Sequence, residues 1–206
     1  MKKHIVRFLA IGAFLAFALP YNLKAQNHIW SIGPEIGANF SKYGNDASGN
    51  IKPGFIGGLS LTYSIENTHA LTGKLLFAQK GAKINGINQS LNYIEMPLVG
   101  RFFFNRNGNF RPNIFIGPSL GILTGATNVK VGESNPTSIH NYSDIYRPLD
   151  FGVTGGLGLN FLIARETRLL FDARYTHGLT DITKSSGYIN NKAISLTAGV
   201  SFGISR

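Results

Sequence analysis

The stretch Ala193–Ser205, AISLTAGVSFGIS, alternates between apolar and small residues along its whole length. Apolar side chains occupy every second position from Ile194 to Ile204, and serine, threonine or glycine fills the positions between them. A β-strand places successive side chains on opposite faces, whereas a helix would scatter these apolar residues around its circumference. The stretch therefore predicts a strand with one apolar face and one face of small, mostly polar residues.

A glycine-rich stretch, Phe151–Phe161 or FGVTGGLGLNF, shows the same alternation. Its glycines do not have the G-x-G-x-x-G spacing of a dinucleotide-binding loop, and no helical pattern follows them. We expect Gly152, Gly156 and Gly158 to keep the inward face small, so that long arginine side chains on neighbouring strands have room. Gly155 is the exception, because it falls on the apolar face.

Alternation at further segments gives a total of eight predicted strands. The other seven cover residues 30–40, 55–65, 70–80, 92–104, 113–123, 151–161 and 168–177. Each has about ten residues or slightly more, which suits a tilted strand that crosses a bilayer. The predicted fold class is all-β, an eight-stranded antiparallel up-and-down transmembrane β-barrel.

The predicted connections alternate in length, as they do in membrane barrels. Short turns are expected at residues 66–69, 105–109 and 164–167, and longer polar loops at residues 41–54, 81–91, 124–150 and 178–192. A soluble β-sandwich or lipocalin-like barrel would also alternate, but its outer face would be charged. Charged residues make up only 15% of this chain, which favours apolar faces that point outward to lipid.

Aromatic residues lie near the ends of the predicted strands. Phe151 and Phe161 are separated by ~33 Å along a strand, or ~25 Å after a tilt of about 40°, which is the height of a barrel's apolar band. We therefore predict an aromatic girdle at the two membrane interfaces, formed by Trp30, Phe40, Phe55, Tyr63, Phe102, Phe151, Phe161, Tyr175 and Phe202.

The N-terminal residues predict a secretory signal peptide at 1–25, followed by one barrel domain at 26–206. Lys2, Lys3 and Arg7 precede an apolar run from Phe8 to Leu19, which is shorter than the ~20 residues of a membrane-spanning helix. An uncleaved N-terminal anchor is the alternative. The chain has no cysteine, which excludes disulfides, thiolate metal sites and a lipoprotein anchor.

Charged residues on the faces opposite the apolar ones are expected to point into the barrel. An eight-stranded barrel is just wide enough for side chains to fill it, so both signs of charge together predict a buried ion-pair network. A narrow polar conduit or a solute site is the alternative. The predicted network comprises Glu35, Lys74, Glu95, Arg101, Arg168, Asp172 and Arg174.

We predict no catalytic, cofactor-binding or metal-binding residues, and no enzymatic activity. His177 shares the outward face with Tyr175, away from Asp172, so these residues cannot form a serine–histidine–acid arrangement. The remaining histidines lack metal-ligand spacing. The formal charge of +10 comes from scattered basic residues and not from a cluster, so we expect no nucleic-acid partner.

The stretch Leu91–Phe104, LNYIEMPLVGRFFF, resembles the PorT-like outer-membrane β-barrel family of Bacteroidota, a porin-family group of small barrels. The recurring pattern is tyrosine, any residue, glutamate, any residue, proline and leucine. Further stretches similar to that family are 112–123, 150–161 and 169–182. The resemblance implies an eight-stranded outer-membrane barrel with no established biochemical activity for most members, although the founding member is linked to a protein secretion system.

These observations predict an outer-membrane protein whose two termini lie in the periplasm. Its expected role is structural or surface interaction through loops 41–54, 81–91, 124–150 and 178–192, with outer-membrane lipids and an extracellular or secretion-system protein as partners. A secretion-system component or a narrow solute conduit is the alternative, and a lipid-modifying enzyme is a third hypothesis.

Overall fold

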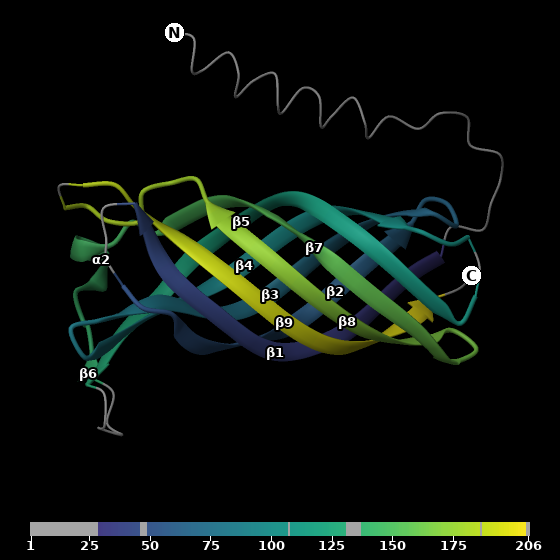
Figure 1. Ribbon diagram of the computed structural model, residues 1–206, viewed down its shortest axis with the longest axis horizontal. Helices are drawn as coiled ribbons and strands as arrows, with labels where there is room; N and C mark the ends of the chain where they lie inside the picture. Colours follow the sequence, from purple (N-terminus) through teal and green to yellow (C-terminus); the bar gives the residue numbers. More distant parts are fainter. Residues whose placement is uncertain (1–28, 46–48, 107, 131–136, 186, 205–206) are drawn as a thin grey trace, which may run out of the picture.

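Eight long antiparallel strands close into a barrel in the computed structural model, which describes residues 29–45, 49–106, 108–130, 137–185 and 187–204 (Figure 1). Strands adjacent in the sequence pair with each other, and the last strand pairs with the first, which confirms the predicted fold class. The strands are β1 (Ile29–Asn45), β2 (Lys52–Ser64), β3 (His69–Ile84), β4 (Ile87–Phe103), β5 (Phe110–Lys130), β7 (Leu149–Ala164), β8 (Thr167–Gly178) and β9 (Ile189–Ile204).

Two short elements lie in the connection between β5 and β7. Strand β6 (Thr137–Ser138) pairs with β5 at Thr127 and Asn128, and helix α2 (Tyr142–Ile145) forms a single turn. Both lie at the end of the barrel that carries the longer connections, and the end of β9 lies at the opposite end. The predicted signal peptide, residues 1–25, lies outside the described residues. None of the helices described here is long and apolar enough to span a membrane.

Several strands continue beyond their predicted ends, so the predicted long loops are too long. The loop predicted at 81–91 is wrong: β3 and β4 continue to a two-residue turn at Asn85 and Gly86, with φ angles of 49° and 76°. Positive φ at both turn residues is what a tight antiparallel hairpin requires, and Asn-Gly meets it. The other three loops are shorter than predicted because β1 continues to Asn45, β5 to Lys130, and β9 begins at Ile189.

Alternation along the strands separates an apolar outer wall from a polar lumen. On β1, Ile36 has 61% of its surface exposed, whereas the adjacent Glu35 has 6%. On β7, Leu157 is exposed and Gly158 is buried. A water-soluble barrel has the opposite arrangement, because its apolar side chains fill the interior. The exposed apolar wall therefore fits a lipid surrounding.

Glycine is required at one lumenal position by the side chains that surround it. A Cβ atom on Gly158 would lie 2.5 Å from Nη1 of Arg101 and Oδ1 of Asn113, and 2.6 Å from Oδ1 of Asp172. Gly158 thus makes room for an arginine, but Arg101 belongs to β4, which does not pair with β7, and not to a neighbouring strand as predicted. At Gly156 the nearest atoms belong to the Ala173 backbone and the Phe115 ring, so arginine is not the reason for that glycine.

Candidate functional site: the lumen and the long-loop end

The first group of charges in the lumen centres on Lys74 of β3. Its Nζ donates hydrogen bonds to both carboxylate oxygens of Glu35, at 3.0 and 2.8 Å, and to Oδ2 of Asp172 at 2.9 Å. Arg101 of β4 contacts both oxygens of Asp172, at 3.0 and 2.8 Å. All four side chains are buried. We call these four residues the lower group, because they lie nearer the short hairpins than the other lumenal charges. The lower group joins strands β1, β3, β4 and β8 across the barrel interior.

Arg101 is held by neutral side chains as well as by Asp172. Its Nη1 donates to Oδ1 of Asn113 at 2.6 Å, and its guanidinium lies 4.6 Å from the centre of the Phe115 ring. Asn113 in turn donates to Oδ1 of Asn160 at 3.2 Å. Several contacts of this kind fix the direction of a side chain that would otherwise be flexible, and a buried charge needs them to offset its desolvation.

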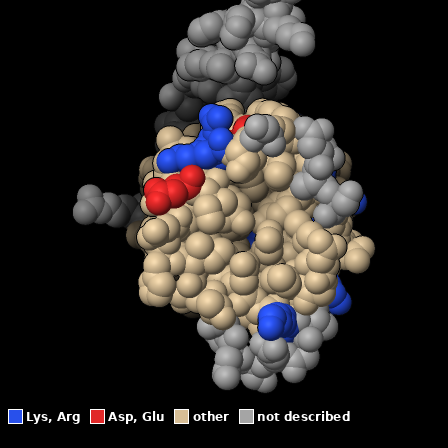
Figure 2. All heavy atoms as spheres, turned by 90° about the vertical axis from the view of Figure 1, so that its left-hand side faces the viewer, with Lys and Arg blue, Asp and Glu red and all other residues tan. Residues whose placement is uncertain are grey.

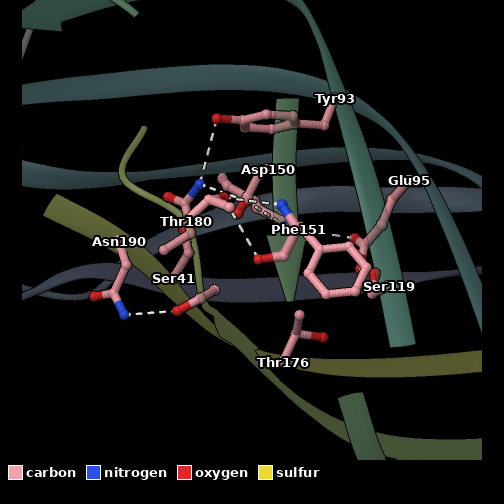
Figure 3. A network of polar contacts seen from close by, with 12 residues as sticks. Ser41, Tyr93, Glu95, Ser119, Asp150, Phe151, Thr176, Thr180 and Asn190 are labelled. Atoms are coloured by element: carbon pink, nitrogen blue, oxygen red, sulfur yellow. Dashed lines mark hydrogen bonds and ion pairs between the residues drawn. The ribbon is translucent and has the colours of Figure 1, made fainter. Parts of the chain in front are cut away.

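A second group of charges lies nearer the long-loop end and centres on Glu95 of β4. Oε2 of Glu95 lies 3.8 Å from Nζ of Lys80 and 3.7 Å from Nη2 of Arg174, and Ser119 donates to Oε1 at 2.9 Å. Lys80 also lies 3.4 Å from Oδ2 of Asp150. We call Glu95, Lys80, Arg174 and Asp150 the upper group. Figure 3 shows Ser119 directed at Glu95, with Asp150 nearby.

The two groups together balance their charge. Four cations, Lys74, Lys80, Arg101 and Arg174, face four acids, Glu35, Glu95, Asp150 and Asp172. The structure brings six of the seven predicted residues into these groups. Arg168 belongs to neither group and lies nearer the short hairpins. Lys80 and Asp150 were not among the predicted residues, although both follow the inward alternation of their strands.

An asparagine connects the upper group to an aromatic ring. Asn191 of β9 donates to Oδ2 of Asp150 at 2.8 Å and to the Tyr93 hydroxyl at 3.3 Å. Lys80 lies 5.2 Å from the centre of the Tyr93 ring, within the range of a cation–π contact. Tyr93 therefore contacts Lys80 through its ring, and it reaches Asp150 through its hydroxyl and Asn191.

An apolar cluster covers the upper group on the side of the long loops. Its buried members come from strands β1, β3, β4 and β5 and from the loop between β8 and β9. Ile182 enters from that loop and is only 1% exposed. The backbone N–H of Ile182 donates to the Ile189 carbonyl at 2.9 Å, which ties the loop to β9. The buried members of this apolar plug are Tyr43, Ala82, Leu91, Tyr93, Leu123, Ala126 and Ile182.

A groove lies on the outer side of the long-loop end, between the ends of β4 and β5 and the segment from Ser138 to Tyr142. Its volume is about 370 Å³. The segment is fixed by a bond from the Ile139 N–H to the Ala126 carbonyl at 3.0 Å, and by the Tyr142 hydroxyl, which donates to the Thr124 carbonyl at 3.3 Å.

The groove is lined by uncharged groups. Its polar side chains are Asn92, Thr127, Ser138, His140 and Tyr142, and the described residues that line it include no aspartate, glutamate, lysine or arginine. Oδ1 of Asn92 is buried and has no hydrogen-bond partner within the described chain. Seen from the long loops, most of the described surface is also neither acidic nor basic, and lysines and arginines lie toward its edges (Figure 2).

The predicted girdle residues lie on the outer wall, in two sets. Near the short hairpins the rings of Trp30 and Tyr63 are 4.7 Å apart, and those of Phe161 and Phe110 are 4.8 Å apart. Strand direction places Trp30, Tyr63, Phe102, Phe161 and Phe202 toward the short-hairpin end, and Phe40, Phe55, Phe151 and Tyr175 toward the long-loop end. Three further rings, which were not among the predicted girdle residues, belong to the first set: Phe104, Phe110 and Phe171.

His177 does not meet an acid of the lumen. Its Nδ1 lies 3.2 Å from the Tyr175 hydroxyl on the outer wall, whereas Asp172 is buried with Arg101 and Lys74. The alternation of β8 separates these residues onto opposite faces.

The chain matches a protein-family model and several solved structures. The model of the family described as outer membrane protein beta-barrel domain matches residues 24–184. No match was found among curated proteins. Solved structures of other barrels share the fold at low sequence identity.

Neisserial surface protein A is 14% identical, with 84% of this chain and 96% of that chain covered and a TM-score of 0.57. The outer membrane protein AlkL in lipid bilayers is 12% identical, with 91% and 98% covered and a TM-score of 0.53. The outer membrane protein OprG of Pseudomonas aeruginosa is 12% identical, with 90% and 100% covered and a TM-score of 0.50. These similarities show a shared fold.

Proposed function

Because this chain belongs to the outer membrane protein beta-barrel domain family, we propose that it is a surface-interaction protein that binds its ligand at the long-loop end. The observation that carries the proposal is the groove beside β4 and β5. Amide, hydroxyl, imidazole and phenol groups line it, and Asn92 offers an acceptor that no described residue uses. Such groups suit an uncharged, hydroxyl-rich ligand, so we propose saccharides as the ligand class.

The side chains that fill the lumen favour a role at the cell surface and argue against a role in transport. Lys74, Arg101 and their acidic partners occupy the middle of the barrel, and the apolar plug lies above them. A solute would have to break several buried ion pairs to pass, which is strongly unfavourable. We therefore do not favour the narrow-conduit alternative.

The finer details of location are part of the same proposal. We propose that residues 1–25 are removed as a signal peptide and that the short hairpins and both termini face the periplasm, as in other outer-membrane barrels. The resemblance of Tyr93, Glu95 and Pro97 to the PorT-like pattern supports a closer relationship to that group. A secretion-system protein would meet the same long-loop surface, which is the second partner class that we propose. The proposal includes no catalytic step.

Binding to saccharides tests the proposal. Purified protein in lipid nanodiscs would be applied to an array of neutral saccharides, together with the variants Asn92→Ala and His140→Ala. We expect the wild type to retain at least one saccharide, and Asn92→Ala to bind it roughly tenfold more weakly, because a buried acceptor is lost.

Asn88→Ala is the matched control, because Asn88 lies on the same strand and the same face but does not line the groove. This variant should bind like the wild type. Equal binding by all variants, or no saccharide retained above empty nanodiscs, would contradict the proposal.

A further inference from the structure

A hollow of about 180 Å³ lies in the lumen between the lower group of charges and the short hairpins. Four arginines line it: Arg101 of the lower group, the exposed Arg165 in the turn between β7 and β8, and two that come from different strands, Arg111 of β5 and Arg168 of β8. Much of the remaining wall carries hydroxyl groups, from Ser31, Ser60, Thr62, Ser64, Thr72 and Ser201. The hollow is thus a polar space, and the guanidinium groups of Arg111 and Arg168 lie at its edge.

These two arginines lack the acidic partners that the other lumenal cations have. Among the described residues, neither Arg111 nor Arg168 takes part in an ion pair, whereas Glu35 and Asp172 at the deep side of the hollow are already bound by Lys74 and Arg101. Glu166, near the opening, is exposed to solvent. The hollow therefore has an excess of positive charge.

Individual nitrogen atoms of the pair are also unsatisfied. Nη1 of Arg168 and Nε of Arg111 are buried and have no hydrogen-bond partner in the described chain. Buried N–H groups are normally paired, because losing water without gaining another acceptor is unfavourable. In addition, the positive charge of Arg168 acts on Arg111, which is unfavourable for two guanidinium groups that have no acidic partner among the described residues.

Arg111 is held in position although it lacks an acid. Its guanidinium lies 4.0 Å from the centre of the Phe103 ring, and its Nη2 donates to the Asn67 carbonyl in the turn between β2 and β3. These contacts use one face and one edge of the guanidinium. Its Nε edge stays unpaired.

We propose that Arg111 and Arg168 form a binding site for a phosphate group. Planar guanidinium groups bind tetrahedral oxyanions through paired, charge-assisted hydrogen bonds, and a phosphate would both satisfy the free N–H groups and separate the two positive charges. The hydroxyl groups of the wall supply further donors. Inorganic phosphate and the headgroup of a phosphomonoester lipid present the same chemistry at the mouth of the hollow.

Calorimetric titration tests the site on the full-length barrel in a phosphate-free, uncharged detergent. One arm adds inorganic phosphate and the other adds short-chain phosphatidic acid. If inorganic phosphate binds, a soluble phosphate is sufficient as the ligand. If phosphatidic acid binds and inorganic phosphate does not, the ligand is a lipid headgroup. In either case we expect Arg111→Gln and Arg168→Gln to weaken binding about tenfold or more, because each removes charge-assisted hydrogen bonds.

Arg106→Gln is the matched control, because Arg106 is an exposed arginine near the same end that does not line the hollow. Its affinity should equal that of the wild type, and heat-modifiable gel mobility would verify that every variant is folded. Thermal unfolding gives a second readout: phosphate should raise the midpoint of the wild type but not of Arg168→Gln. Absence of saturable binding in both arms, or an equal loss in Arg106→Gln, would overturn the proposal.

Discussion

Arg101 of β4 binds both carboxylate oxygens of Asp172 on β8, a strand that is not its neighbour in the barrel. The contact therefore crosses the lumen instead of following the sheet. Lys74 shares the same carboxylate, so one acid ties two cations from β3 and β4 to the opposite wall. Hydrogen bonds between the strand backbones close the barrel, and this ion pair holds in place the side chains that fill its lumen.

Replacing that acid should destabilise the barrel strongly. Asp172→Asn would leave Arg101 and Lys74 buried without their shared negative charge, and breaking a buried ion pair on one side costs about 3–5 kcal/mol. The measurement is urea unfolding in detergent or lipid, followed by the fluorescence of Trp30, the single tryptophan of the chain.

The control for this prediction is Asp144→Asn, which changes an exposed aspartate in α2. Its free energy of unfolding should stay within about 0.5 kcal/mol of the wild type. If Asp172→Asn were no less stable than Asp144→Asn, the lumenal network would contribute nothing measurable.

A methyl group at position 158 should also disrupt the lower group. In Gly158→Ala the new Cβ would overlap Arg101, Asn113 and Asp172, all of which are fixed by hydrogen bonds. Overpacking of this kind costs about 1–3 kcal/mol. The matched variant is Gly100→Ala, whose Cβ would find its nearest atom, the Ile116 carbonyl oxygen, 3.9 Å away. Equal stability of the two variants would show that the lumen adapts to the added methyl group.

Alternation in the sequence was enough to predict the fold, because residues of opposite character face lipid and lumen on every strand. It was less able to predict where the strands end. Beyond the apolar band, β3, β4 and β5 continue with polar residues on the outer face, such as Asn88 and Asn92, so the contrast between faces disappears although the pairing does not. The Asn85–Gly86 dipeptide between Ile84 and Ile87 was a signal for a tight hairpin at this point.

The sequence predicted the kind of site in the lumen, a buried ion-pair network, but only some of its residues. Lys80 lies on the same face as Lys74, and Asp150 on the same face as Gly152, so extending the alternation would have found both. Arg168 also falls on the inward face of its strand. Alternation shows which face a residue is on, but not how far along the barrel axis it lies. No pattern in one strand shows which residues of distant strands lie at the same level. The groove beside β4 was not predictable, because it depends on how the segment Ser138–Tyr142 folds back onto β5.

The proposed orientation predicts which turns antibodies can reach on intact cells. A short epitope tag inserted between Asn85 and Gly86 should be detected from outside, because this turn lies at the long-loop end and both residues are exposed. The same tag between Arg165 and Glu166, in the turn between β7 and β8, should be detected only after the outer membrane is permeabilised. The reverse pattern would place the short hairpins outside the cell.

The central claim is that the lumen is filled and closed, and single-channel recording in planar lipid bilayers tests it most directly. Purified protein should give no steady conductance, because the two charged groups and the apolar plug occupy the lumen. A steady current that changes in the variant Arg101→Ala would show that ions pass the lower group and would contradict the claim.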